Sequence, residues 1–194
     1  MLDQLIDSAT TIVNQTKNNM YFLSQMLLVL WTVFFVNIVL GKRLLMLGIR
    51  PRQMSGLLGI VCAPFLHANF NHLFFNCIPL MILANFILIQ GIPYFLHVTI
   101  IIMLISGFLT WCFAKKGIHV GASGVITGYW SLLVSDIYQQ GTLTAIILGI
   151  VCLYYFAGIL FAIFPGEKGV SWQGHLFGFL AGIIVSYIPL SFLM

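Results

Sequence analysis

Long apolar runs that almost lack charge constrain the fold of this chain more than any other feature. Only 6% of its 194 residues are charged, whereas 61% are hydrophobic. About 20 apolar residues in a helix cross the roughly 30 Å hydrocarbon core of a bilayer. Windows of this kind lie near residues 21–40, 70–89, 93–114, 122–138, 143–164 and 173–193. We therefore predict an all-α, polytopic membrane protein, a bundle of six transmembrane helices.

The same pattern predicts one domain. Residues 1–19 are too polar and too few to form a domain, so we expect a short polar N-terminal tail followed by a transmembrane domain over residues 20–194. Asp3 and Asp7 stand where a signal peptide would be basic, so none is expected. The formal net charge of +4 forms no stripe, which argues against nucleic-acid binding. The four cysteines are isolated in apolar runs and are expected to be buried apolar side chains.

A long insert separates the first two predicted helices. It runs from Gly41 to about Asn69 and begins with several basic residues. Its apolar stretch, Leu57 to Leu66, is too short to span a bilayer. We expect this stretch to lie in the membrane interface or to fold back onto the bundle.

Unusual polar residues gather at one end of the predicted bundle. With six spans, the second, fourth and sixth helices run in the same direction, so their N-terminal ends lie at the same face. These ends carry His67, Asn71, His72, Asn76, Ser123 and His175. Ionisable side chains within membrane spans are expensive and mark function by default. We therefore predict a functional site at this end.

Residue spacing indicates how these groups meet. His72 and Asn76 are four residues apart and share a helix face. Small residues, which let helices approach closely, accompany the other two groups: Gly121, Gly124 and Gly128 around Ser123, and Gly178 and Gly182 after His175. The structural alternative is that Gly121 to Gly124 is only a helix-packing patch. Close packing of the two glycine faces would bring the Ser123 hydroxyl within reach of the His175 imidazole.

These residue types suit acyl transfer. A neutral histidine can take the proton of a serine hydroxyl, which makes Ser123 the candidate nucleophile and His175 the candidate base. His72, Asn76 and the Ser123 N–H are candidate oxyanion donors. A third, orienting carboxylate is not expected: Asp136 lies about 20 Å further along its helix, and Glu167 could approach only through a loop excursion. We therefore expect a Ser-His dyad.

Metal and cofactor chemistry have little support in the sequence. A zinc protease needs ligands such as H-E-x-x-H, and the only glutamate has no histidine at that spacing. A metal site of His67, His72 and His175 would lack an anionic ligand. We predict neither a metal nor a cofactor, and we interpret His67 as structural.

The chain resembles the rhomboid intramembrane serine proteases of the six-helix bacterial type. The resemblance rests on His67, the run from His72 to Asn76, the run from Gly121 to Gly124, and the run from His175 to Gly178 with Gly182. It implies the dyad and oxyanion roles given above and an insert partly within the membrane. It also implies substrate entry gated by the fifth helix and the loop from Pro165 to Trp172. The implied partners are the lipid bilayer and transmembrane protein substrates, cut near a small residue.

Two features depart from that family. An aromatic residue often stands four positions after the nucleophile and packs on the catalytic histidine, but this chain has Thr127, so a different contact is expected to hold His175. The insert has Arg50-Pro51-Arg52 instead of the Trp-Arg pair of some relatives.

The charge distribution opposes the family's usual orientation. Seven of the eight basic residues fall in loops on the predicted catalytic face: Lys42, Arg43, Arg50, Arg52, Lys115, Lys116 and Lys168. Only Lys17 lies opposite. The positive-inside rule would place that face in the cytoplasm, whereas the resemblance implies the non-cytoplasmic face of a bacterial inner membrane. Following the resemblance, we expect the catalytic end on the non-cytoplasmic side.

Two alternative functions stay open. One is a non-catalytic rhomboid-like protein that binds membrane clients. The other, a small-solute transporter, has less support because the chain has no inverted repeat with paired broken helices. His119, near Ser123, is interpreted as a solvated loop residue, with a hydrogen bond that positions its loop as the alternative. The oligomeric state is left open.

Overall fold

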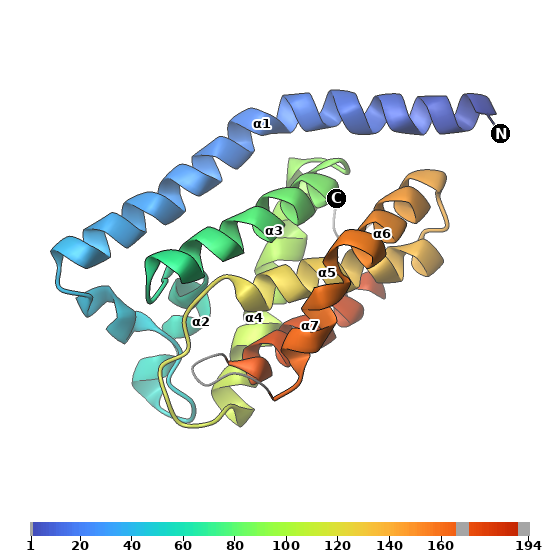
Figure 1. Cartoon of the computed structure of the whole chain (residues 1–194). Helices are drawn as coiled ribbons and strands as arrows, with labels where there is room; N and C mark the ends of the chain where they lie inside the picture. Colours follow the sequence, from blue (N-terminus) through green and yellow to red (C-terminus); the bar gives the residue numbers. More distant parts are fainter. Residues whose placement is uncertain (1, 166–170, 190–194) are drawn as a thin grey trace.

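The structure, a computed structural model, describes residues 2–165 and 171–189, and its regular elements are helical (Figure 1). The long helices are α1 (Leu2–Val39), α3 (Phe70–Leu88), α4 (Ile92–Phe113), α5 (Ser123–Gln139), α6 (Leu143–Phe156) and α7 (Trp172–Ser186). Shorter pieces are α2 (Gly59–Cys62) and the 3₁₀ turns η1 (Arg43–Leu47), η2 (Met54–Gly56), η3 (Ala63–Phe65) and η4 (Ala157–Ile163). The all-α prediction is confirmed, and a helix occupies each of the six predicted windows.

Not all six helices have the length of a membrane span. Within the described residues, four helices are long and apolar enough to cross a bilayer: α1, α3, α4, and α6 together with η4. With 17 residues in α5 and 15 in α7, these two helices are shorter than the roughly 20 residues that span the hydrocarbon core. The chain is thus a multi-pass membrane protein with at least four candidate spans.

The first helix extends further than the sequence predicted. Residues 2–19 continue α1 toward the N-terminus as mostly exposed helix, and Figure 1 shows α1 bending as it passes the bundle. Side-chain amides tie α1 to the end of α3: Asn19 Nδ2 donates to Asn85 Oδ1 at 3.2 Å, and Asn85 Nδ2 donates to Thr16 Oγ1 at 2.8 Å. These bonds satisfy polar groups that would otherwise be costly in an apolar setting.

The insert between α1 and α3 folds back onto the bundle, which is one of the two arrangements expected from the sequence. Gly107 of α4 leaves room for Ile60 of α2, since a Cβ at Gly107 would lie 2.7 Å from the Ile60 side chain. The Arg52 guanidinium donates to the carbonyl oxygens of Cys112 and Ala114 at 3.0 and 2.9 Å. Arg52 therefore satisfies backbone acceptors at the C-terminal end of α4 and fixes the insert there.

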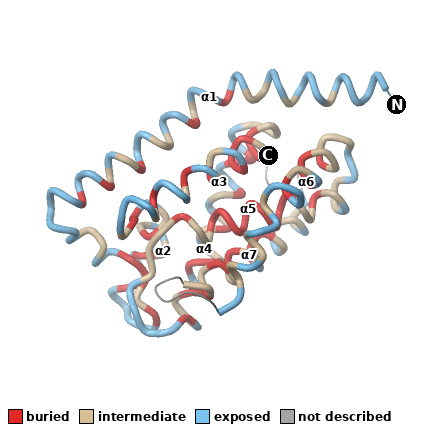
Figure 2. The backbone as a smooth tube through the Cα atoms, viewed as in Figure 1, coloured by how far each residue is buried: buried red, intermediate tan, exposed pale blue. Residues whose placement is uncertain are grey.

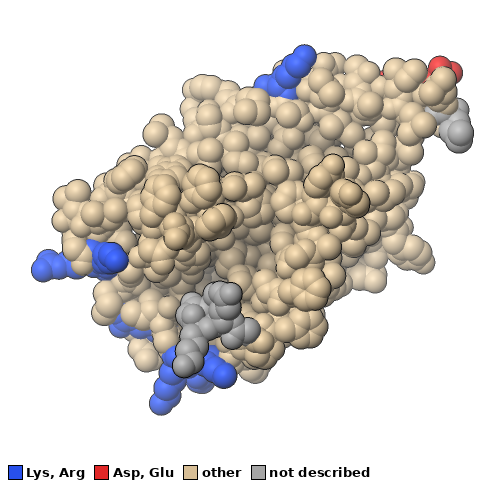
Figure 3. Space-filling model, viewed as in Figure 1, with Lys and Arg blue, Asp and Glu red and all other residues tan. Residues whose placement is uncertain are grey.

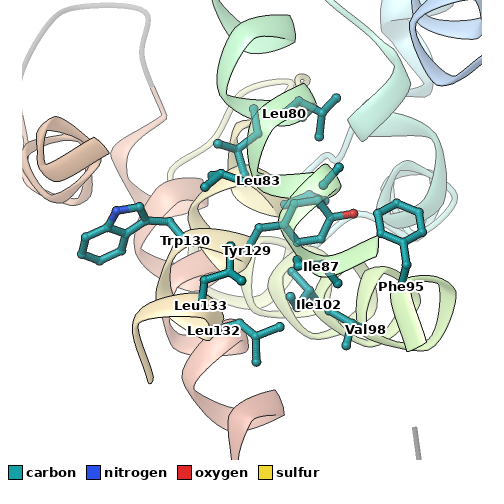
Figure 4. Close-up of a cluster of buried hydrophobic side chains, with 14 of the residues drawn as sticks. Leu80, Leu83, Ile87, Phe95, Val98, Ile102, Tyr129, Trp130, Leu132 and Leu133 are labelled. Carbon is teal, nitrogen blue, oxygen red and sulfur yellow. The ribbon is translucent and has the colours of Figure 1, made fainter. Parts of the chain in front are cut away.

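Helix α5 lies at the centre of the bundle. Every residue from Val125 to Leu133 is buried, and Figure 2 shows this stretch in red between its neighbours. Figure 4 shows Tyr129 and Trp130 extending from α5 in opposite directions. The Tyr129 hydroxyl lies 2.6 Å from Thr99 Oγ1, and Trp130 Nε1 donates to the Cys152 carbonyl at 3.1 Å. Because both polar tips have partners, α5 is held on two sides by α4 and α6.

Positive charge gathers at the end of the bundle where α5 begins. The described basic residues of the insert and of the loop between α4 and α5 are Lys42, Arg43, Arg50, Arg52, Lys115 and Lys116. Figure 3 shows separate groups of blue atoms toward this end of the molecule and one further group over α1, whose basic residue is Lys17. The seventh predicted member, Lys168, lies outside the described residues.

Candidate active site

Ser123 is the first residue of α5. The loop before it needs a glycine at position 121. Gly121 has a φ of +118°, a conformation that disfavours other residues. Its N–H donates to the Ala63 carbonyl at 2.9 Å. A Cβ on Gly121 would lie 2.6 Å from His72 Nε2 and 3.5 Å from Asn76 Nδ2. The loop before Ser123 therefore lies directly against two of the predicted oxyanion donors.

His175 lies in the first turn of α7 and is buried, with 8% of its surface exposed. Its Nδ1 atom lies 2.9 Å from the carbonyl oxygen of Ala162 in η4. A carbonyl oxygen can only accept, so Nδ1 carries the ring proton. The other nitrogen, Nε2, is therefore free to accept a proton from a neighbouring group.

The two dyad candidates are neighbours without a direct bond. Thr127 Oγ1 lies 3.0 Å from the carbonyl oxygens of both Ser123 and His175, so one side chain contacts the backbone of both residues. In the described part of the chain, the Ser123 hydroxyl makes no hydrogen bond to the His175 ring. Nucleophile–base bonds are often long in a free enzyme and shorten in the substrate complex.

His67 organises the oxyanion candidates. Its Nε2 atom lies 3.1 Å from Asn76 Nδ2 and 3.5 Å from the backbone N of Ala122. Burial, reinforced by the neighbouring His72 imidazole, lowers the pKa of His67 to about 4. The neutral Nε2 accepts one amide hydrogen of Asn76 and leaves the second one free. The structural role that the sequence suggested for His67 therefore includes orienting the Asn76 side chain.

The predicted glycine faces of α5 and α7 pack against each other. A Cβ on Gly178 would overlap the carbonyl oxygen of Gly124, and one on Gly182 would overlap that of Gly128. A Cβ on Gly124 would lie 3.2 Å from the Gly174 carbonyl. Backbone-to-backbone contact of this kind requires glycine and brings the start of α5, with Ser123, close to the start of α7, with His175.

A small cavity with a mainly apolar lining and a few polar groups adjoins Ser123. Its volume is about 50 Å³, and a single buried water needs roughly 10–15 Å³. The polar groups that line it come from α4, the α4–α5 loop and the start of α7: Ser106, Thr110, His119 and Ser171. The cavity can therefore hold a few water molecules beside the serine.

His119 makes a contact that the spacing of residues did not indicate. Its Nδ1 lies 2.7 Å from Ser171 Oγ, and its Nε2 lies 2.9 Å from the Lys115 carbonyl oxygen. Ser171 Oγ also accepts from the Gly174 N–H at 3.3 Å and so caps α7. His119 thus ties the loop before Ser123 to the start of the helix that carries His175, which is the alternative role considered above.

Two carboxylates were considered above as a third catalytic residue, and the described part of the site contains neither of them. Asp136 lies in the last turn of α5, at the end opposite Ser123, where its Oδ2 accepts from Gln140 Nε2 at 2.7 Å. Glu167, with most of the predicted gating loop, lies outside the described residues. In the described structure, the only group bound to the His175 ring is the Ala162 carbonyl.

Comparison with known proteins matches most of the chain to one family. Residues 52–192 match the family model described as Rhomboid domain. An uncharacterized protein of Mycobacterium bovis and one of Mycobacterium tuberculosis are each 38% identical to this chain over 169 residues, covering 82% of it and 70% of their own length. An uncharacterized protein of Mycobacterium leprae is 36% identical over 151 residues, covering 73% of this chain and 59% of its own.

Proposed function

Because this chain belongs to the rhomboid family, we propose that it is an intramembrane serine endopeptidase that cleaves transmembrane segments of other membrane proteins. The observation that carries the proposal is the convergence of four polar groups from three helices. The loop before Ser123 contacts His72 and Asn76 of α3, and Thr127 contacts the backbones of Ser123 and His175. Ionisable groups at this depth are expensive, which favours a functional role for them.

In the proposed reaction, His175 Nε2 takes the proton of Ser123 while the serine oxygen attacks the carbonyl carbon of the substrate. The tautomer imposed by the Ala162 carbonyl supports this step, because it leaves Nε2 unprotonated. The resulting imidazolium then gives its proton to the leaving amine as the peptide bond breaks. An acyl-enzyme on Ser123 remains.

The negative oxygen of the tetrahedral intermediate needs donors in a setting of low dielectric constant. We assign them to the His72 ring, the free amide hydrogen of Asn76 and the Ser123 N–H. The contact between Asn76 and His67 supports this assignment, because it fixes the amide before substrate binds. Donors that are already in place stabilise a transition state more, because no free energy is spent on moving them during the reaction.

Hydrolysis of the acyl-enzyme requires water at the same depth. The cavity of about 50 Å³ beside Ser123, with the hydroxyls of Ser106, Thr110 and Ser171 in its lining, has room for it. With His175 Nε2 again as the base, the water attacks the acyl carbon, and its proton returns to the serine oxygen as product leaves. This cycle needs no metal or cofactor.

The membrane arrangement belongs to the same proposal. We propose that all six long helices cross the membrane, with the shorter α5 and α7 enclosed by the longer ones, and that the insert lies partly in the membrane. Substrate would enter beside α6 and the loop 165–172. We also propose a bacterial inner membrane with the catalytic end on the non-cytoplasmic side. Reporter fusions at both chain ends and in the α4–α5 loop would test that orientation against the positive-inside rule.

Labelling with a fluorophosphonate probe tests the mechanism. Detergent-purified wild type should react covalently, and Ser123→Ala and His175→Ala should not. Ser24→Ala, which removes an exposed hydroxyl of α1, should react like wild type. Absence of labelling in folded wild type would overturn the protease proposal and favour a protein that binds membrane clients without cutting them.

A further inference from the structure

Thr127 contacts α7 through its hydroxyl, where the family often has an aromatic side chain. Its Oγ1 atom lies 3.0 Å from three carbonyl oxygens, those of Ser123, Gly124 and His175. The first two belong to its own helix, and bonds of this kind are common for threonine in helices. The third crosses to α7 and reaches the candidate base.

The contact repeats one turn deeper. Ser131, four residues after Thr127, donates its hydroxyl to the Phe179 carbonyl at 2.8 Å and lies 3.1 Å from the Gly128 carbonyl. Phe179 in turn lies four residues after His175. Two hydroxyls of α5 thus bind two carbonyls of α7 with the same spacing on both helices.

Each hydroxyl faces a glycine of α7. A Cβ on Gly178 would overlap Thr127 Oγ1, and a Cβ on Gly182 would overlap Ser131 Oγ. The two contacts are therefore alike in donor, acceptor and packing. They differ in one respect. The outer contact, from Thr127, ends on His175 itself, whereas the inner contact, from Ser131, ends on Phe179, which has no catalytic assignment.

The outer contact fixes His175 at a second point. The Ala162 carbonyl holds the ring at Nδ1, and the Thr127 hydroxyl holds the backbone of the same residue to the helix that carries Ser123. One contact thus holds the ring and the other holds the backbone that carries it, so the two together limit how far the ring can shift relative to α5. A displacement of about 1 Å in such a group can lower a rate by roughly 100-fold.

We propose that Thr127 is a positioning residue that orients His175 toward Ser123 through its bond to the His175 backbone, in place of aromatic packing. The inference rests on the proposed protease function and adds a role to it. The hydroxyl, and not the size of the side chain, is the part that acts. Valine, which has the shape of threonine without the donor, should not replace it, whereas serine should.

The test compares three variants with wild type: Thr127→Val, Thr127→Ser and the matched control Ser131→Ala. Each is purified in detergent, its thermal midpoint is measured, and the second-order rate of fluorophosphonate labelling is determined. Thr127→Val should label at least about 10-fold more slowly, and Thr127→Ser should restore most of the rate. Ser131→Ala should lose thermal stability and keep the wild-type labelling rate.

A second measurement does not depend on activity. ¹⁵N and ¹³C NMR signals of the His175 ring should shift in Thr127→Val and stay unchanged in Ser131→Ala. Unshifted signals in Thr127→Val, wild-type labelling by that variant, or an equal loss of rate in Ser131→Ala would overturn the positioning role. If wild type fails to label, the protease proposal fails, and the ring signals alone decide whether Thr127 orients His175.

Discussion

The Nδ1 atom of His175 lies 2.9 Å from the carbonyl oxygen of Ala162, thirteen residues earlier in the chain. This bond determines which ring nitrogen carries the proton, the role that a carboxylate has in a catalytic triad. A neutral carbonyl fixes the tautomer but gives the imidazolium less electrostatic stabilisation than a carboxylate would. In the proposed dyad, the Ala162 carbonyl would thus orient the base as a carboxylate does in a triad.

The first prediction concerns that tautomer. ¹⁵N NMR of selectively labelled protein should show a protonated Nδ1 and an unprotonated Nε2 at His175 near neutral pH. Signals can be assigned by comparison with His175→Ala. A proton on Nε2 would contradict the proposed mechanism, because His175 could then not accept the serine proton.

The second prediction concerns the contact between α5 and α7. Gly178→Ala should destabilise the protein by about 1–3 kcal/mol, because the added methyl group overlaps the Gly124 carbonyl and the Thr127 hydroxyl. It should also slow labelling of Ser123 by separating the two helices. Gly158→Ala is the matched control, since among the described residues no atom beyond its chain neighbours lies within 4 Å of its added Cβ. Equal thermal midpoints for the two variants would show that the close approach is not required.

The third prediction concerns the oxyanion donors. Asn76→Ala should lower the turnover of a transmembrane substrate by about 100- to 1,000-fold, the usual loss for one such donor, with little change in substrate binding. Asn71→Ala, at the exposed start of the same helix, should cut at the wild-type rate. A loss confined to substrate binding would assign Asn76 to recognition instead.

The fourth prediction concerns pH. Burial lowers the pKa of His67 from 6.5 to about 4, so the unfolded state binds a proton at higher pH than the folded state does. The neutral ring therefore contributes fully to the free energy of unfolding above pH 6.5. This contribution, on the order of 3 kcal/mol, is lost as the pH falls to about 4. His67→Gln should therefore show a shallower fall in thermal midpoint over this interval. The exposed His97→Gln should keep the wild-type slope, and equal slopes for both variants would contradict the assignment.

The sequence alone determined the class of protein and the residues worth examining. Apolar windows predicted the helices, because a bilayer admits few other structures. The direction of successive helices placed Ser123, His175, His72 and Asn76 at one end, and their spacing put glycines where α5 meets α7. The resemblance to rhomboid proteases gave the family that the comparison then showed. Apolar windows alone did not determine the number of spans, because a helix enclosed by others can be shorter than a bilayer is thick.

Tertiary structure decided what holds each of these groups. The bond from Ala162 to the His175 ring, the contact of Thr127 with the His175 backbone, the bond of His67 to Asn76 and the anchoring of Arg52 on α4 join residues 9 to 62 positions apart. Helical periodicity tells which face a residue occupies, but not how neighbouring helices are rotated or how closely they approach. Hydrogen bonds depend on tenths of an ångström in those quantities, and only the packing of the whole bundle sets them.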